Sequence, residues 1–260
     1  MIRRFNYTGR KRIPRPKLSF SLRKSSKNTL SFDASIDFTS LDLPGSAQIY
    51  IEAYRRAYFQ RFACGTVSAP RFPVNSPLEG LDPDALVLFR VKVVDRKGRI
   101  LASADSIRPK RKEEDEGARE SLLPVEFVDL GNLVWRLDLE GDLPILQLNK
   151  RVENIREIAR SDGHFLGLVY PEVFRQILLK IVVEEDCNDP DAEAGDEVEG
   201  MGQWLRFAIQ VLGRRHLPPP GQSEPARQQK LRWIDEVVEA FCSNHQVLER
   251  FVKEQRPKGK

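Results

Sequence analysis

The sequence predicts an α+β protein in which an N-terminal antiparallel β-sandwich or barrel-like domain precedes a C-terminal helical domain. Two observations support this fold class. From the start to about residue 150, apolar and polar residues mostly alternate, as they do in half-buried strands. Beyond residue 150, the apolar residues recur at helical spacing instead. We therefore expect a basic, β-rich domain at 1–150 and a helical domain at 151–260.

The expected strands are short and separated by turn residues, a pattern typical of sandwiches and barrels. Segment 95–99, Asp-Arg-Lys-Gly-Arg, has the composition of an exposed hairpin turn, in which Gly98 supplies the unusual backbone angles. It should join strands at 86–94 and 100–107. The remaining strands are expected at 17–22, 30–38, 49–51, 125–130, 134–139 and 145–149.

Segment 54–67 has two interpretations. Tyr54, Tyr58 and Phe62 are spaced by four residues, which would suit one face of a helix. The sequence Ala-Cys-Gly-Thr-Val at the end of the segment favours a strand. We prefer one long strand with a β-bulge near Arg55 and Arg56.

Four helices are expected after residue 150. The first is short and lies within 152–159, and the second begins at Pro171, because proline is well accommodated in the first turn of a helix. The third covers 204–212, and a long last helix runs from about Glu224.

Three charged segments lie outside these elements. Residues 108–120 are charged at almost every position and should form a flexible loop. Residues 184–199 contain nine acidic residues and no basic one, and we expect an acidic loop there. A basic tail is expected at the C-terminal end.

Composition indicates a folded protein of a reducing compartment. Apolar residues make up 40% of the chain and charged residues 31%, a globular balance that a disordered chain would not show. Cys64, Cys187 and Cys242 are odd in number and far apart, which does not suggest a disulfide framework. Because no apolar run has the length of a spanning helix or leader, we expect a cytoplasmic protein without a membrane partner.

The usual catalytic and cofactor motifs are missing. The sequence has no Walker A loop, no GxGxxG and no GxSxG, and its three histidines form no metal-binding spacing. We expect no cofactor, no small-molecule substrate and no enzymatic activity of the chain alone.

One pattern supports an alternative function, a metal-dependent nuclease. Pro83-Asp84 followed by Asp95-Arg96-Lys97 fits the loose PD…(D/E)xK spacing, in which two carboxylates hold Mg²⁺ and a lysine positions the water. The residues would be Asp84, Asp95 and Lys97. Turn chemistry explains the same letters without catalysis, because Asp95 to Gly98 also suits a hairpin turn.

The basic N-terminal segment is the main functional signal. Its first 30 residues hold ten Lys or Arg and no acidic residue, interleaved with aromatic side chains. Cations neutralise phosphates and aromatic rings stack on unpaired bases, so the segment predicts a nucleic-acid surface. The candidate residues are Arg3, Arg4, Tyr7, Arg10, Lys11, Arg12, Arg15 and Lys17. Two other interpretations remain open: an edge strand protected by charge, and a structural module whose basic face meets an acidic protein.

Three stretches carry a resemblance to a group of proteins. They are FNYTGRKRI at 5–13, LPVEFVDLGNLVWRLDLE at 123–140 and LVYPEVFRQIL at 168–178. They resemble accessory proteins encoded beside helicases and nucleases in bacterial antiphage defence islands. The resemblance implies a non-catalytic scaffold or adaptor subunit of an antiviral defence complex, with a helicase, ATPase or nuclease as partner. It assigns no role to any single residue.

Overall fold

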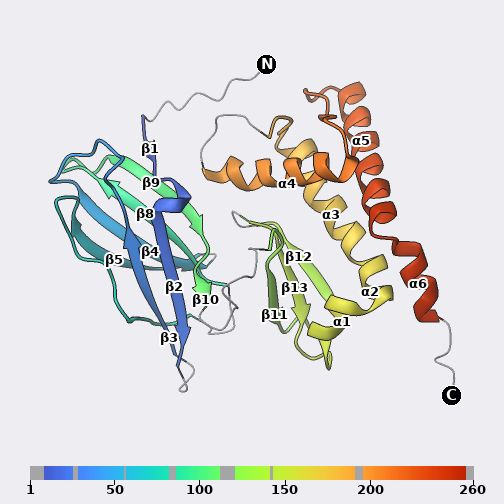
Figure 1. Ribbon diagram of the computed structural model, residues 1–260, viewed down its shortest axis with the longest axis horizontal. Helices are drawn as coiled ribbons and strands as arrows, with labels where there is room; N and C mark the ends of the chain where they lie inside the picture. The colour runs from blue at the N-terminus through green and yellow to red at the C-terminus, as the bar shows by residue number, and fades with distance from the viewer. Residues whose placement is uncertain are drawn as a thin grey trace. The chain divides into compact units, whose positions relative to one another are not determined.

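A computed structural model describes residues 9–25, 29–55, 57–81, 86–111, 121–140, 143–190 and 196–255. It confirms the predicted α+β class, with strands in the N-terminal part and helices in the C-terminal part (Figure 1). The chain forms two compact units, one made mainly of Arg4–Ser121 and the other of Leu122–Glu193 and Val198–Lys260. We call these the N-terminal unit and the C-terminal unit.

The N-terminal unit contains two sheets. The larger has the strand order β1 (Lys11–Arg12), β9 (Ile100–Ile107), β8 (Leu88–Val94), β4 (Gln48–Arg55), β5 (Tyr58–Thr66) and β6 (Ala69–Pro70). The smaller has the order β10 (Lys110–Arg111), β2 (Leu18–Lys24), β3 (Leu30–Ile36) and β7 (Ser76–Leu78). Neighbouring strands are antiparallel except at one edge of each sheet, where β1 pairs parallel with β9 and β10 pairs parallel with β2.

The core of this unit lies between the two sheets. Strand alternation directs every second side chain inward, and there the Phe89 ring packs against those of Phe20 and Phe32 in tilted geometry, with centroid distances of 4.9 and 4.8 Å. The turn Arg15–Lys17 carries the chain from β1 in one sheet to β2 in the other. The predicted sandwich or barrel-like arrangement is confirmed.

The prediction of one long strand at 54–67 is wrong. The segment forms the end of β4 and then β5, and these two antiparallel strands pair with Tyr54 opposite Phe59 and Arg55 opposite Tyr58. Only Arg56 and Ala57 separate the two strands, and neither is a glycine, asparagine or proline, so the usual sequence signal of a turn is missing.

The hairpin between β8 and β9 is confirmed. The carboxylate of Asp95 accepts hydrogen bonds from the backbone N–H groups of Lys97 and Arg99 at 2.8 and 2.9 Å, and from Arg99 Nε at 2.8 Å. Gly98 has a φ of 78°, which lies in the left-handed region that glycine adopts without strain. Strand bounds also agree with the predictions for β2, β3 and β11–β13 to within about two residues.

The C-terminal unit begins with a three-stranded sheet. Its order is β11 (Val125–Val128), β13 (Ile145–Asn149) and β12 (Trp135–Asp138), with β11 parallel and β12 antiparallel to β13. Leu146 and Leu148 are fully buried in the same core as the helices. The boundary expected near residue 150 therefore marks the change from strands to helices, whereas the division into compact units falls at residues 121–122.

The helices are α1 (Ile155–Ser161), α2 (Gly163–Leu168), α3 (Tyr170–Leu178), α4 (Asp196–Leu212), α5 (Glu224–Asn244) and α6 (Val247–Gln255), and a π-helical segment (Leu179–Glu184) continues α3. The sequence predicted α1, α3, α4 and α5, but neither α2 nor α6. The C-terminal end of the expected acidic loop is helical, because α4 already begins at Asp196. Most of the expected loop at 108–120 and the basic tail after residue 255 lie outside the described residues.

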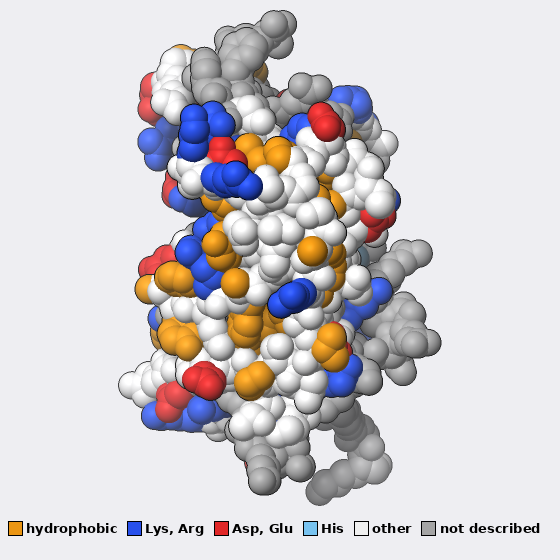
Figure 2. Space-filling view, turned by 90° about the vertical axis from the view of Figure 1, so that its left-hand side faces the viewer, with side chains coloured by type: hydrophobic (Ala, Val, Ile, Leu, Met, Phe, Trp, Pro, Cys, Tyr) orange, Lys and Arg blue, Asp and Glu red, His pale blue; other side chains and the backbone are white. Residues whose placement is uncertain are grey.

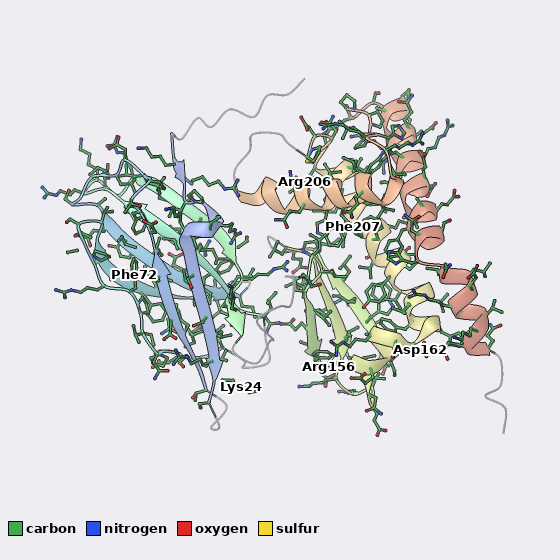
Figure 3. The ribbon with its side chains drawn as sticks, in the orientation of Figure 1. Lys24, Phe72, Arg156, Asp162, Arg206 and Phe207 are labelled. Atoms are coloured by element: carbon green, nitrogen blue, oxygen red, sulfur yellow. The ribbon has the colours of Figure 1, made fainter. Side chains whose placement is uncertain are left out.

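Caps and aromatic packing fix these helices. The Asp162 carboxylate accepts a hydrogen bond from Phe165 N at 2.8 Å and caps α2 (Figure 3). Phe174 of α3 packs against Phe207 of α4 and Phe241 of α5, with centroid distances of 5.3 and 5.4 Å. The side chain of Lys230 in α5 is buried and pairs with Asp186, which ties α5 to the chain after the π-helical segment. No helix in the described part of the chain is long and apolar enough to span a bilayer.

Candidate nucleic-acid interface

The predicted N-terminal site residues fall into three groups. Arg3, Arg4 and Tyr7 lie outside the described residues. Arg10, Lys11 and Arg12 are exposed at the edge of the larger sheet, where β1 pairs with β9. Lys11 contacts both the backbone oxygen and the carboxylate of the exposed residue Asp42.

Arg15 and Lys17 have partners inside the N-terminal unit. Arg15 Nη2 donates to the backbone oxygens of Asp105 and Ser106 at 2.7 and 3.2 Å, which fastens the turn after β1 to β9. Lys17 forms an ion pair with Asp37. Both cations therefore stabilise the fold, and neither is placed among the exposed cations at the edge of β1.

Sheet register joins Arg12 to a row of side chains that crosses five strands. Arg12 of β1 is opposite Ser103 of β9, Ser103 is opposite Lys92 of β8, Lys92 is opposite Tyr50 of β4, and Tyr50 is opposite Ala63 of β5. Residues that are directly opposite in a sheet lie on the same face. This face is the one turned away from the core, because the neighbouring residues Ile49, Ile51 and Val91 are buried in the core.

A second row lies two residues further along the strands. Glu52 of β4 stands between Arg61 of β5 and Arg90 of β8, its register partners. Its Oε1 accepts from Arg61 Nε at 2.8 Å, and its Oε2 accepts from Lys92 Nζ at 3.0 Å. Arg90 Nε lies 2.6 Å from Oε2 as an ion-pair contact, without the alignment of a hydrogen bond. One carboxylate thus holds three cations.

The Glu52 carboxylate is only 1% exposed, whereas the Arg61 side chain is 51% exposed. Burial by itself would raise the pKa of Glu52, but hydrogen bonds from Lys92 and Arg61 and the charges of Lys92 and Arg90 outweigh burial and lower this pKa below its ordinary value of 4.5. The carboxylate therefore stays ionised near neutral pH and keeps the cations in fixed positions.

A third row supplies aromatic rings. Tyr54 of β4 is opposite Leu88 of β8 and Phe59 of β5. The Arg90 guanidinium lies 4.5 Å from the centre of the Tyr54 ring. That of Arg61 lies 5.5 Å from the Tyr50 ring centre and 5.9 Å from the Phe59 ring centre. Cations over aromatic faces at these distances attract the ring electrons.

We call these three rows the outer face. Its charged and aromatic side chains include Arg12, Tyr50, Glu52, Phe59, Arg61, Arg90 and Lys92. Strand alternation also places Asp105 of β9 on this face, so four cations and two carboxylates leave an excess of two positive charges. In the space-filling view, Lys and Arg side chains lie along the left margin among hydrophobic ones and several Asp and Glu (Figure 2).

The residues of the alternative nuclease site are not brought together among the described residues. Asp84 lies outside them, and the Asp95 carboxylate is engaged by three hydrogen bonds within its own turn. These hydrogen bonds lower the pKa of Asp95, and the one from the Arg99 backbone N–H has the largest effect. In the described ranges, no three His, Cys, Asp or Glu side chains are grouped as a metal site.

Sequence reasoning missed most of the outer face. Arg12 alone was among the predicted residues, while Tyr50, Phe59, Arg61, Arg90 and Lys92 were not. A signal was present in the segment Ile49-Tyr50-Ile51-Glu52-Ala53-Tyr54, where an acidic residue shares one face of a strand with two tyrosines. An acidic residue that is buried there needs cationic partners on the adjacent strands.

Comparisons with known proteins give no family for this chain: no family model, no curated protein and no solved structure matches it.

Proposed function

We propose that the protein is a non-catalytic adaptor subunit that binds nucleic acid through the outer face of its N-terminal unit, mainly by contact with phosphates. The observation that carries this proposal is the fixed array of cations beside aromatic rings. Arg12, Arg61, Arg90 and Lys92 come from three different regions of the chain and meet on one face. Glu52 holds three of these cations, Arg61, Arg90 and Lys92, which therefore lose little conformational freedom when they meet a polyanion.

Charge and exposure support the same function. Arg10 and Lys11, the residues before Arg12, are also exposed, at the edge of the sheet beside this face. Because these cations would contact the phosphate backbone of the nucleic acid, binding should show little sequence preference. It should also weaken steeply as the salt concentration rises.

The experiment is a salt titration of binding to single-stranded DNA, duplex DNA and RNA. Replacing Arg12 and Arg61 by Ser should reduce the slope of log affinity against log salt by up to about two units on duplex DNA, with about 0.9 per phosphate contact. The matched control is Arg227→Ser with Arg232→Ser, two exposed cations of α5 in the C-terminal unit, which should leave the slope unchanged.

Two results would overturn the proposal. One is the absence of wild-type binding to all three nucleic acids near 50 mM salt, in which case the outer face would be assigned to an acidic protein surface. The other is an equal reduction of the salt slope in the α5 control, which would mean that affinity depends on the net charge of the protein and not on the outer face.

We further propose that the C-terminal unit joins the protein to a helicase, ATPase or nuclease of a bacterial antiviral defence complex. This context rests on the resemblance of segments 5–13, 123–140 and 168–178, two of which lie in the C-terminal unit. The test is purification at endogenous level followed by identification of the bound proteins. Recovery of the chain alone, at a concentration where it is folded, would contradict this part of the proposal.

A further inference from the structure

The Phe59 ring is exposed on the outer face, in the second residue pair of the β4–β5 hairpin. Its residue is 52% exposed, although it lies inside β5 and opposite Tyr54. A single exposed apolar side chain is common on protein surfaces, but this ring has the Arg61 guanidinium 5.9 Å from its centre and so belongs to a surface that combines a cation with aromatic rings.

Arg61 lies near two aromatic rings and is hydrogen-bonded to Glu52. Its guanidinium is near the centres of both the Tyr50 and the Phe59 ring, and Glu52 holds it from below. Alternate residues of a strand are about 6.5 Å apart, so a ring, a cation and a second ring follow one another at regular short intervals across β4 and β5. Phe59, Arg61 and Tyr50 thus place two rings that can stack on bases next to a cation that can bind a phosphate.

Duplex and single strand use such an array differently. In a duplex, the bases are stacked inside and show only their edges in grooves that admit a helix or a two-stranded ribbon. The outer face spans three strands, β8, β4 and β5, and is therefore too broad to enter a groove. On a duplex it can contact only the phosphates. An unpaired strand can contact the same cations with its phosphates and also place its bases on the rings.

We propose that the outer face binds unpaired nucleotides, with bases stacked on Phe59 and Tyr50 and with Arg61 as the cation between them. The inference rests on the proposed function and narrows it from nucleic acid in general to single strands. DNA and RNA single strands share this chemistry, because every base has an aromatic face.

The experiment compares Phe59→Leu with wild type on a single-stranded oligonucleotide and on a duplex of equal length. Loss of stacking should weaken single-strand binding by about tenfold or more, while duplex affinity and the salt slope stay the same. Phe59→Tyr keeps the ring and should restore single-strand binding. Tyr58→Leu is the matched control, because alternation places the adjacent ring on the opposite side of β5.

The outcomes separate this inference from the proposed function. Equal wild-type affinity for single strand and duplex, or equal loss on both in Phe59→Leu, would overturn the single-strand preference and leave phosphate binding in place. A loss in Tyr58→Leu as large as that in Phe59→Leu would also overturn it. Absence of all nucleic-acid binding would overturn the proposed function itself. Thermal melts of each variant establish that the comparison is made on folded protein.

Discussion

Arg61 and Glu52 are joined across β5 and β4 by a hydrogen bond of 2.8 Å from the arginine Nε to the carboxylate Oε1. The same carboxylate faces Arg90 and Lys92 on β8. A buried charge needs compensation, and here three cations that reach solvent supply it. The arrangement links stability to binding, because the three cations that neutralise Glu52 are also the ones that we propose contact phosphates.

Replacing Glu52 by Gln should therefore lower stability. The three cations would lose their shared partner and repel one another, at a cost of about 2 kcal/mol. This is less than the roughly 3–5 kcal/mol expected for breaking a fully buried pair, because each cation can turn towards water. The measurement is urea denaturation at neutral pH.

The control for this prediction is Asp42→Asn. The Asp42 side chain is fully exposed and pairs only at the surface with Lys11, so its loss should change stability by less than about 0.5 kcal/mol. A Glu52→Gln protein as stable as Asp42→Asn would mean that the buried carboxylate does not organise this part of the sheet.

Several carboxylates make the N-terminal unit sensitive to acid. Hydrogen bonding to Lys17 lowers the pKa of Asp37, and the Arg99 backbone N–H lowers the pKa of Asp95. The pKa of Glu52 is lowered as well, despite burial. A lowered folded-state pKa means that the unfolded chain binds protons first as pH falls. The contribution of these carboxylates to the free energy of unfolding is therefore fully present above their ordinary pKa values near 4. It is lost as the pH falls towards their lowered pKa values in the folded state.

We expect the free energy of unfolding to be flat between pH 7 and about 5 and to fall steeply below about pH 4. Denaturant titrations at a series of pH values check this. In Glu52→Gln the decline should be shallower, because one of the titrating groups is gone. An unchanged pH slope in that variant would show that Glu52 is not a source of the acid sensitivity.

Local chemistry explains which parts of the fold could be predicted. The β8–β9 hairpin has an Asp and a Gly at the positions that its turn uses, and α3 has a proline in its first turn, so both were found. The β4–β5 hairpin was missed because its turn residues are arginine and alanine. The apolar residues of α6 are diluted by five charged or amide side chains, and none of its residues is fully buried, so the helical pattern there is weak.

The outer face could not be predicted for a different reason. Its residues come from positions 12, 50–61 and 90–92, and only the order of strands in the larger sheet brings them together. Parallel pairing of β1 with β9 is a long-range event that no local pattern encodes. The sequence showed where cations are concentrated, but Arg15 and Lys17 have internal partners, while Arg61, Arg90 and Lys92 lie in segments of ordinary charge.

Cys64 should be unreactive in the folded protein. Its side chain is buried in β5, and burial raises the pKa of the thiol to about 11. The thiolate is the nucleophile, so at pH 8 the group is both neutral and inaccessible. Alkylation with iodoacetamide, followed by mass mapping, should label the partly exposed Cys187 first. Labelling of Cys64 at a similar rate without denaturant would contradict the burial.

The last prediction concerns the contact between α2 and α6, which depends on two glycines. A Cβ at Gly163 would lie 2.8 Å from the backbone oxygen of Arg250 and 2.8 Å from Glu254 Cγ. A Cβ at Gly167 would lie 3.3 Å from the side chains of Val247 and Phe251. Backbone atoms cannot turn away, whereas side chains can adjust by a few tenths of an ångström. The two positions should therefore respond differently to alanine.

Gly163→Ala should cost about 1–3 kcal/mol, since it pushes the α6 backbone away from α2. Gly167→Ala should be close to neutral, because the mild overlap is offset by the helix propensity of alanine, about 1 kcal/mol better than glycine. Because α6 has no fully buried residue, it should detach before the rest of the unit unfolds. Hydrogen exchange in residues 247–255 should thus accelerate in Gly163→Ala and stay near the wild-type rate in Gly167→Ala. Equal protection of α6 in both variants would mean that the close approach at Gly163 does not hold the helix in place.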